Sequence, residues 1–190
     1  MRSFTLIEIV VVISIILILS VFTFPNFRDA NAKFALDRAV YKLSQDLRSA
    51  EEISMSSQTT DPAIFGSAFF PAGGYGIYFQ EASSSYILFA DCDGDGQYDA
   101  TSHPSKQSCS KATRDNPCAE EIKEISIESG IKIGTLSPKS DNSLAITFFP
   151  PDPTITINNS LATTASISLV FKTRTEKTVS INLSGLIEIQ

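Results

Sequence analysis

The sequence predicts an α+β fold, in which a long N-terminal membrane-spanning helix, kinked near Pro25, packs on a mostly antiparallel, β-rich globular head. Two observations predict it. Residues 4–24 are an apolar run with a single charge, Glu8, whereas the chain after Thr59 is rich in Gly, Pro, Ser and aromatic residues arranged in short alternating segments. The expected parts are a leader (1–3), an apolar helix (4–24), an amphipathic continuation of that helix (25–57) and a head (58–190).

The apolar run is long enough, as counted from the sequence, to cross a lipid bilayer. Residues 4–24 would span about 31 Å as a helix, which is close to the thickness of one bilayer core. Apolar side chains occur on every side of this helix, so it should be buried in lipid or among other helices. Arg2 precedes the run and favours a cytoplasmic N-terminus. We therefore expect a single-pass protein of the cytoplasmic membrane.

Two other interpretations of the run stay open. A secretory signal peptide would also have a basic residue, an apolar run and an Ala-x-Ala site such as Ala30-Asn31-Ala32. A plain membrane anchor would need only the apolar run. Glu8 counts against both, because a carboxylate in hydrocarbon is costly and usually marks a functional position.

The segment Phe4-Thr5-Leu6-Ile7-Glu8, followed by an apolar helix, resembles the cleavage and methylation segment of type IV pilins and type II secretion pseudopilins. The resemblance implies that prepilin peptidase cuts between Ser3 and Phe4 and that the new Phe4 amine is N-methylated. It also implies that Glu8, the fifth mature residue, acts in assembly, and that Pro25 is the proline at the end of the apolar segment. Ser3 departs from the pattern, since the family usually has Gly before the cleaved bond.

The resemblance also supplies a partner for Glu8. Cleavage would give Phe4 a free, positively charged amine, which can pair with the Glu8 carboxylate of a neighbouring subunit. Removing one member of a buried ion pair costs about 3–5 kcal/mol, because the other charge is left stranded. The implied partners are other pilin-like subunits, the prepilin peptidase and methyltransferase, the inner-membrane assembly platform, and membrane lipid before assembly.

The β-rich remainder and the ending Thr178–Ile189 look most like the minor pseudopilin H and its pilus relatives. This implies a structural subunit of a type II secretion pseudopilus, with a periplasmic or extracellular head. The alternative is a minor or major type IV pilus subunit, with a role in DNA uptake. Nucleic acid is not expected as a partner, because Lys and Arg number 15 against 21 Asp and Glu, and Ser184–Gln190 has no basic side chain.

The helix is expected to continue beyond Pro25. Proline cannot donate the helical hydrogen bond to the carbonyl of Val21, so we expect a kink there. Apolar residues then recur at helical spacing to about Ser57, which predicts one stripe packed on the head. The members of this stripe are Ala32, Ala35, Leu36, Ala39, Val40, Leu43, Leu47, Ala50 and Ile53.

Alternating apolar and polar residues predict the strands of the head. These are Tyr75–Gln80, Ser85–Ala90, Glu124–Glu128, Ile131–Leu136, Leu144–Phe149, Thr154–Asn158, Ser166–Thr173 and Thr178–Ile189. We expect the first two to pair. Residues Arg174–Lys177 should form the turn before the last strand, and Gly185 should mark a bulge within it.

A calcium site is expected after the second strand. Carboxylates at the first, third and fifth positions, followed by Gly96, match the start of an EF-hand-type loop. The expected ligands are Asp91, Asp93, Asp95, Gln97 and Asp99. Gln97 would offer its carbonyl, Asp99 would bind directly or through water, and Ser102 stands where a bidentate Glu is usual. A plain turn held by Asp side chains stays open as the alternative.

Three cysteines allow one internal disulfide with one thiol left over. A bond between Cys109 and Cys118 would close a short polar loop and is favoured, although pairing of Cys92 with either stays open. There is no Cys-x-x-Cys for zinc, and no nucleophile or phosphate-binding motif, so neither zinc nor an enzyme is expected. The acidic pair Glu120 and Glu121 is interpreted as a solvated strand start.

Overall fold

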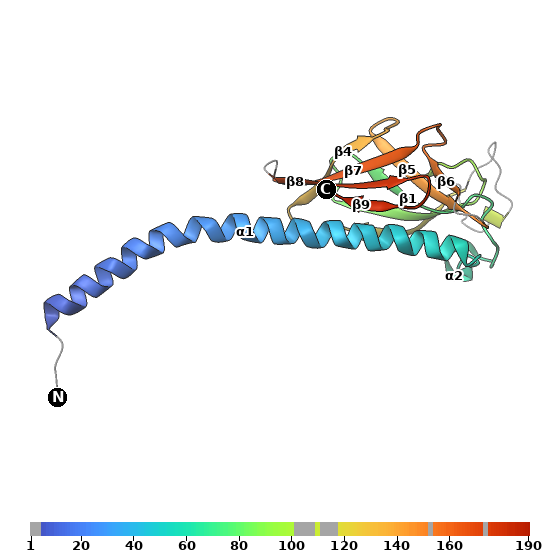
Figure 1. Cartoon of the computed structure of the whole chain (residues 1–190). Helices are drawn as coiled ribbons and strands as arrows, with labels where there is room; N and C mark the ends of the chain where they lie inside the picture. Colours follow the sequence, from blue (N-terminus) through green and yellow to red (C-terminus); the bar gives the residue numbers. More distant parts are fainter. Residues whose placement is uncertain (1–4, 101–108, 111–117, 152–153, 173–174) are drawn as a thin grey trace. The chain divides into compact units, whose positions relative to one another are not determined.

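The computed structural model describes residues 5–100, 109–110, 118–151, 154–172 and 175–190, and of residues 22–30 only the backbone (Figure 1). The chain forms two compact units, Met1–Ala35 and Leu36–Gln190. The described residues contain two helices, α1 (Leu6–Met55) and α2 (Pro62–Phe65), and nine strands. The strands are β1 (Gly74–Gln80), β2 (Ser85–Asp91), β3 (Glu121–Ser126), β4 (Ile131–Ser137), β5 (Ser143–Phe149), β6 (Thr154–Ile157), β7 (Thr164–Phe171), β8 (Thr175–Asn182) and β9 (Ile187–Ile189).

Helix α1 is 50 residues long and begins in the first unit. Its first turn closes on the carbonyl of Thr5, which accepts hydrogen bonds from the backbone N–H groups of Glu8 (3.1 Å) and Ile9 (3.3 Å). From Leu6 to Val21, every large apolar side chain is at least 50% exposed. The helix continues through Pro25, and Figure 1 draws α1 as one continuous ribbon.

The prediction that this helix spans a membrane is wrong. In the part of the chain that the structure describes, no helix is both long and apolar enough to cross a bilayer. The expected single-pass location in the cytoplasmic membrane is overturned by this finding.

The second part of α1, from Leu36 onward, lies in the second unit, Leu36–Gln190, which is the head of the structure. It packs on the strands by one stripe. Leu36, Val40, Leu43, Leu47 and Ala50 are completely buried and recur at alternating intervals of four and three residues. This spacing places them on one face of the helix. The stripe coincides with the one that helical periodicity predicts, and the helix ends at Met55, two residues before the expected end.

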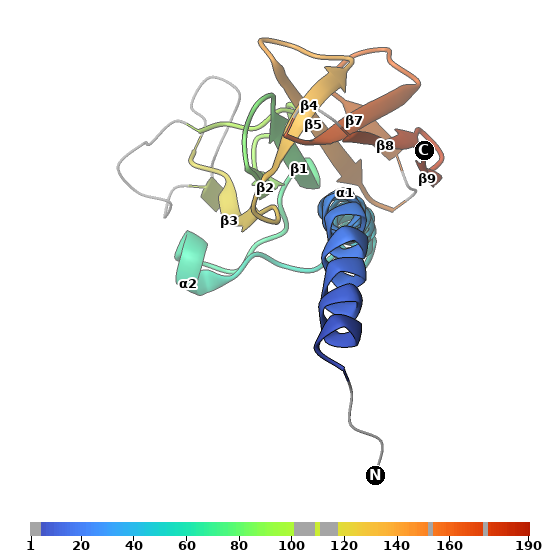
Figure 2. The same ribbon diagram turned by 90° about the vertical axis from the view of Figure 1, so that its left-hand side faces the viewer.

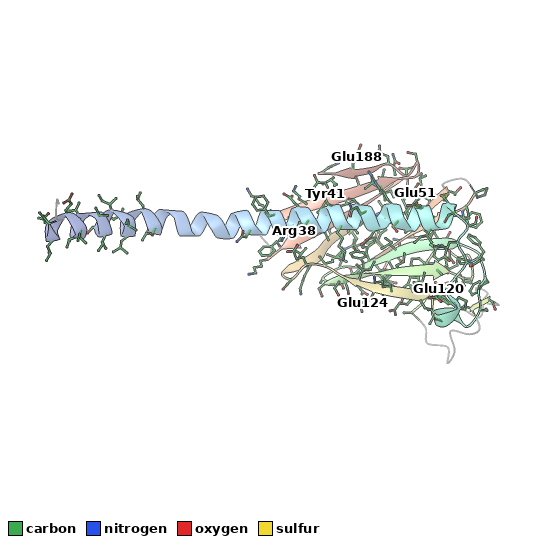
Figure 3. The ribbon with its side chains drawn as sticks, turned by 90° about the horizontal axis from the view of Figure 1, so that it is seen from below. Arg38, Tyr41, Glu51, Glu120, Glu124 and Glu188 are labelled. Carbon is green, nitrogen blue, oxygen red and sulfur yellow. A yellow bond between two sulfur atoms is a disulfide. The ribbon has the colours of Figure 1, made fainter. Side chains whose placement is uncertain are left out.

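Polar contacts fix this part of α1 to strands of both sheets. The Tyr86 hydroxyl on β2 donates a hydrogen bond to the Asp46 carboxylate. Lys177 on β8 forms an ion pair with Asp37 at 2.5 Å. In Figure 3, Glu124 of β3 lies on one side of α1 and Glu188 of β9 lies on the other. The helix therefore lies along the line where the two sheets come together.

The strands form two antiparallel sheets. One sheet has the order β3-β2-β1-β5-β6 and the other the order β4-β7-β8-β9. Figure 2 shows β2 and β3 on one side of the body and β8 and β9 on the other. Apolar partners face one another across the central pairs, with Ile77 of β1 opposite both Leu88 of β2 and Ile146 of β5. Cross-strand pairs of this kind stabilise the sheet and hold its register.

The sequence located most strands within a few residues, and the expected pairing of the first two is confirmed. The expected turn at Arg174–Lys177 is wrong, because β8 already begins at Thr175.

Gly185 does not form a bulge. It has a φ of +79°, which glycine adopts without strain, and it ends β8 in a tight turn before β9. Asn182 holds this turn, since its side-chain oxygen accepts hydrogen bonds from the N–H groups of Ser184 and Leu186.

Candidate functional site

The acidic loop, residues 91–99, begins where β2 ends. Asp91 is buried, and its carboxylate accepts hydrogen bonds from the N–H groups of Gly94 (2.8 Å) and Gly96 (2.9 Å). Both glycines have positive φ, +74° and +76°, so the chain can fold back sharply over the carboxylate. A Cβ on Gly73 would collide with that same carboxylate. The sequence Asp-x-x-Gly-x-Gly therefore builds a tight cradle around one acid.

The next two aspartates continue the turn. Asp93 accepts a hydrogen bond from the N–H of Asp95 (3.1 Å), and Asp95 accepts one from the N–H of Gln97 (2.7 Å). These are the Asx hydrogen bonds that the alternative interpretation of the sequence requires. The same geometry also gathers ligands, because one carboxylate oxygen each from Asp91, Asp93 and Asp95 lies within 4.8 Å of the others.

Glu120 is the member of this site that the sequence did not reveal. It lies one residue before β3, where the sequence suggested a solvated position, yet it is only 1% exposed. Its carboxylate accepts hydrogen bonds from the N–H groups of Cys92 (2.7 Å) and Asp99 (3.1 Å). Carboxylate oxygens of Asp93, Asp99 and Glu120 form a second group within 4.8 Å. Figure 3 labels Glu120 on the body of the head.

Burial changes the acidity of the site. Burial raises the pKa of Glu120 to about 9, and the charges of Asp91 and Asp93 act in the same direction. The pKa of Asp91 is raised to about 6 for the same first reason, although its two backbone donors oppose the shift. Among the described residues, no Lys or Arg forms an ion pair with either carboxylate. Both acids are therefore buried without a cationic partner among the described residues.

The donors suit a hard divalent cation. Calcium takes six to eight oxygen ligands, and carboxylates are prominent among them. The buried Thr147 hydroxyl oxygen is a further polar atom near the loop, and it lacks a hydrogen-bond partner among the described residues. It lies close to Gly96, since a Cβ placed on this glycine would be 3.7 Å from it. The side chain of Gln97 is exposed, and Ser102 lies outside the described residues. The residues that the structure brings together are Asp91, Asp93, Asp95, Asp99 and Glu120.

The expected disulfide between Cys109 and Cys118 is confirmed, with a Cα–Cα distance of 5.3 Å. Cys92 is a buried free thiol, so the alternative pairings are not those of this structure. All three cysteines belong to a core cluster with Phe65 of α2 and Tyr75 of β1. The cluster reaches the acidic loop through Cys92.

The residues predicted to act in processing and assembly lie at the start of the chain. Ser3 and Phe4 are outside the described residues, and so is the side chain of Pro25. Glu8 is exposed in the first turn of α1, next to Ile7, which is 71% exposed. Glu8 is the only ionisable side chain between Leu6 and Val21.

Comparisons of the chain with known protein families, with curated proteins and with solved structures found no match.

Proposed function

We propose that the protein is a pilin-like structural subunit of a type II secretion pseudopilus, similar to the minor pseudopilin H. In this proposal prepilin peptidase cuts between Ser3 and Phe4, the Phe4 amine is methylated, and the subunit assembles through the first part of α1. The observation that carries the proposal is the exposed apolar surface from Leu6 to Val21, which bears Glu8 as its one charge.

The apolar surface from Leu6 to Val21 requires a binding partner that buries it. Exposed apolar patches of this extent mark interaction sites, because burying one Val, Leu or Ile side chain stabilises a complex by about 1.5–3 kcal/mol. The surface covers all sides of the helix rather than a stripe, so a single groove would leave part of it in water. Several helices packed around it would cover it completely. The same segment of other pilin-like subunits provides such helices.

Glu8 then sets the register of this packing. Inside a bundle of apolar helices its carboxylate would lose water, which is costly unless a cation lies beside it. The amine of Phe4 in the next subunit is such a cation once cleavage has freed it. A shift of one helix along another would separate the two charges and leave both buried and unpaired. Assembly therefore selects one offset between neighbours.

The test compares Glu8→Ala with Glu52→Ala, which removes an exposed carboxylate from the head part of the same helix. Both variants are expressed with the other filament subunits, and the fraction of chain in sedimented filaments is measured. Mass spectrometry of the mature N-terminus reports cleavage. We expect Glu8→Ala to be cleaved but nearly absent from filaments, and Glu52→Ala to assemble like the wild type. Equal incorporation of the two variants would refute the proposal.

Ser3→Gly provides a separate test of processing. Gly restores the residue that the family usually has before the cleaved bond, so cleavage by prepilin peptidase should become faster. Cleavage at a different bond, or no cleavage of either chain, would contradict the assignment of Phe4 as the first mature residue.

The pseudopilus is preferred over a type IV pilus because the head beyond α1 is almost entirely β. In the described residues its one further helix is the four-residue α2. Co-purification from cells that contain both kinds of filament distinguishes the two. Subunits of the secretion pseudopilus should accompany this chain, whereas recovery with pilus subunits would favour the alternative.

We propose further that the acidic loop binds one calcium ion. Support comes from the convergence of Asp91, Asp93 and Asp95, and from Glu120, which brings a carboxylate from a distant part of the chain. Glu120 would take the part of the acidic ligand that is missing at Ser102. Calcium would stabilise the end of β2 and the start of β3.

A further inference from the structure

Three sulfur atoms meet in the core of the head. The Sγ atoms of Cys92, Cys109 and Cys118 all lie within 4.8 Å of one another, and the three residues are 4%, 1% and 2% exposed. Cys92 directly follows β2, and Cys118 lies just before Glu120 and β3. The free thiol of Cys92 is therefore next to a disulfide whose two halves are both within a short movement of it.

The surroundings of the three sulfurs are apolar. Phe65, Tyr75 and Ala90 are buried in the same cluster, and the partly buried Ile53 and Ile122 pack against it. An external thiol or oxidant would have to displace these side chains to reach the disulfide. Cys92 needs no such access because it is already inside. Burial also raises the pKa of the Cys92 thiol, so attack by its sulfur is slow, but it requires no outside partner.

We propose that Cys92, Cys109 and Cys118 form an internal thiol–disulfide exchange centre in which Cys92 is an alternative disulfide partner. In the exchange the Cys92 thiol loses its proton and its sulfur attacks Cys109 or Cys118. The Cys109–Cys118 bond breaks, a new bond to Cys92 forms, and the released sulfur takes up a proton. One thiol and one disulfide are present before and after, so the exchange requires no oxidant or reductant.

The alternative bonds would hold different parts of the chain. The bond of this structure closes a loop between cysteines nine residues apart. A Cys92–Cys118 bond would instead join the acidic loop to the segment that carries Glu120. The two groups of carboxylates that surround the loop would then be covalently tied to one another. Exchange would therefore change the tether beside the acidic loop while leaving the strands in place.

Variants that remove one cysteine at a time test the proposal. Full-length Cys118→Ser and Cys109→Ser are prepared under oxidising conditions, free thiols are alkylated in denaturant, and peptides are mapped without reduction. We expect a Cys92–Cys109 bond in most molecules of the first variant and a Cys92–Cys118 bond in most molecules of the second. Recovery of two alkylated cysteines from both variants, with circular dichroism like that of the wild type, would overturn the proposal.

A measurement on the wild type keeps the test valid if those variants fail to fold. The protein is incubated for increasing times, then quenched in acid and mapped in the same way. Disulfides that contain Cys92 should accumulate with time in the wild type. The Cys92→Ser protein is the control and should keep only the Cys109–Cys118 bond. A wild type that retains only this bond at all times, or forms disulfide-linked dimers instead, would contradict the exchange.

Discussion

The Glu120 carboxylate accepts a hydrogen bond of 2.7 Å from the backbone N–H of Cys92, and this contact joins the start of β3 to the acidic loop after β2. The second oxygen of the same carboxylate accepts a hydrogen bond from the N–H of Asp99 at the far end of the loop. Glu120 thus holds both ends of the loop. The stability of this part of the head depends on whether Glu120 is protonated, ionised, or balanced by a cation.

Calcium should stabilise the head through the acidic loop. A ligand present at about 100 times its dissociation constant adds about 2.7 kcal/mol to the free energy of unfolding, which raises the melting temperature by about 5 °C or more. We expect this rise when calcium replaces chelator for the wild type, and no rise for Asp93→Ala. Glu188→Gln, which changes an exposed acid on β9, should respond like the wild type. An unchanged melting temperature in calcium and chelator would leave only the turn held by Asx hydrogen bonds.

The head should lose stability as the pH rises in the presence of chelator. The pKa of Glu120 is about 9 in the fold and near 4.5 when unfolded, so between these values the folded state binds more protons. The stabilisation is complete below about pH 4.5 and is lost as the pH rises to about 9. Between about pH 6.5 and 9, above the pKa of Asp91, we expect the melting temperature to fall by about 5 °C.

Glu120→Gln identifies the group responsible for this pH dependence. The amide cannot ionise, and its oxygen can still accept one of the two backbone hydrogen bonds. The melting temperature of the variant should therefore stay nearly constant over the same range of pH. A variant that falls as steeply as the wild type would assign the effect to another group.

Tyr86→Phe should destabilise the head by about 1–2 kcal/mol. The change removes the hydroxyl that donates to the Asp46 carboxylate and so leaves a partly buried acid without this donor. Tyr78→Phe is the matched control, because its hydroxyl makes only a 3.4 Å contact with the side chain of Gln80. Urea denaturation of both variants measures the difference. Equal midpoints would show that the contact between α1 and β2 contributes little.

Leu43→Ala should destabilise the head by about 2–5 kcal/mol. Leu43 is completely buried in the stripe of α1, and truncation leaves a cavity as well as removing apolar contacts. Arg48→Ala changes an exposed residue of the same helix and should alter the free energy of unfolding by less than about 0.5 kcal/mol. A small effect of Leu43→Ala would contradict the packing of this stripe on the sheets.

Local patterns in the sequence predicted the features that depend on neighbouring residues. The stripe of α1 follows from helical spacing, and the disulfide joins two cysteines that are close in the chain. Asp91, Asp93 and Asp95 meet because one tight turn contains all three. The order of the strands was not predictable, because it depends on which distant segments bury one another.

Glu120 could not be found from the sequence for the same reason. Its donors, Cys92 and Asp99, are more than twenty residues away, and an acid before a strand is usually solvated. The membrane prediction depended on a count of apolar residues in 4–24, whereas no helix in the described part of the chain is both long and apolar enough to cross a bilayer. The turn at Gly185 was misplaced because a bulge and a tight turn both favour glycine with positive φ.

The strand order also bears on how heads behave at high local concentration. An open sheet edge can recruit a strand from another chain and start aggregation. Here β3 presents the exposed Lys123 and Glu124, while β6 and β9 are only four and three residues long. The remaining edge, β4, is occupied by the β1–β2 turn, where the N–H of Ile133 donates to the carbonyl of Ser83 at 2.9 Å. Crowded heads are therefore poor templates for the addition of strands from other chains.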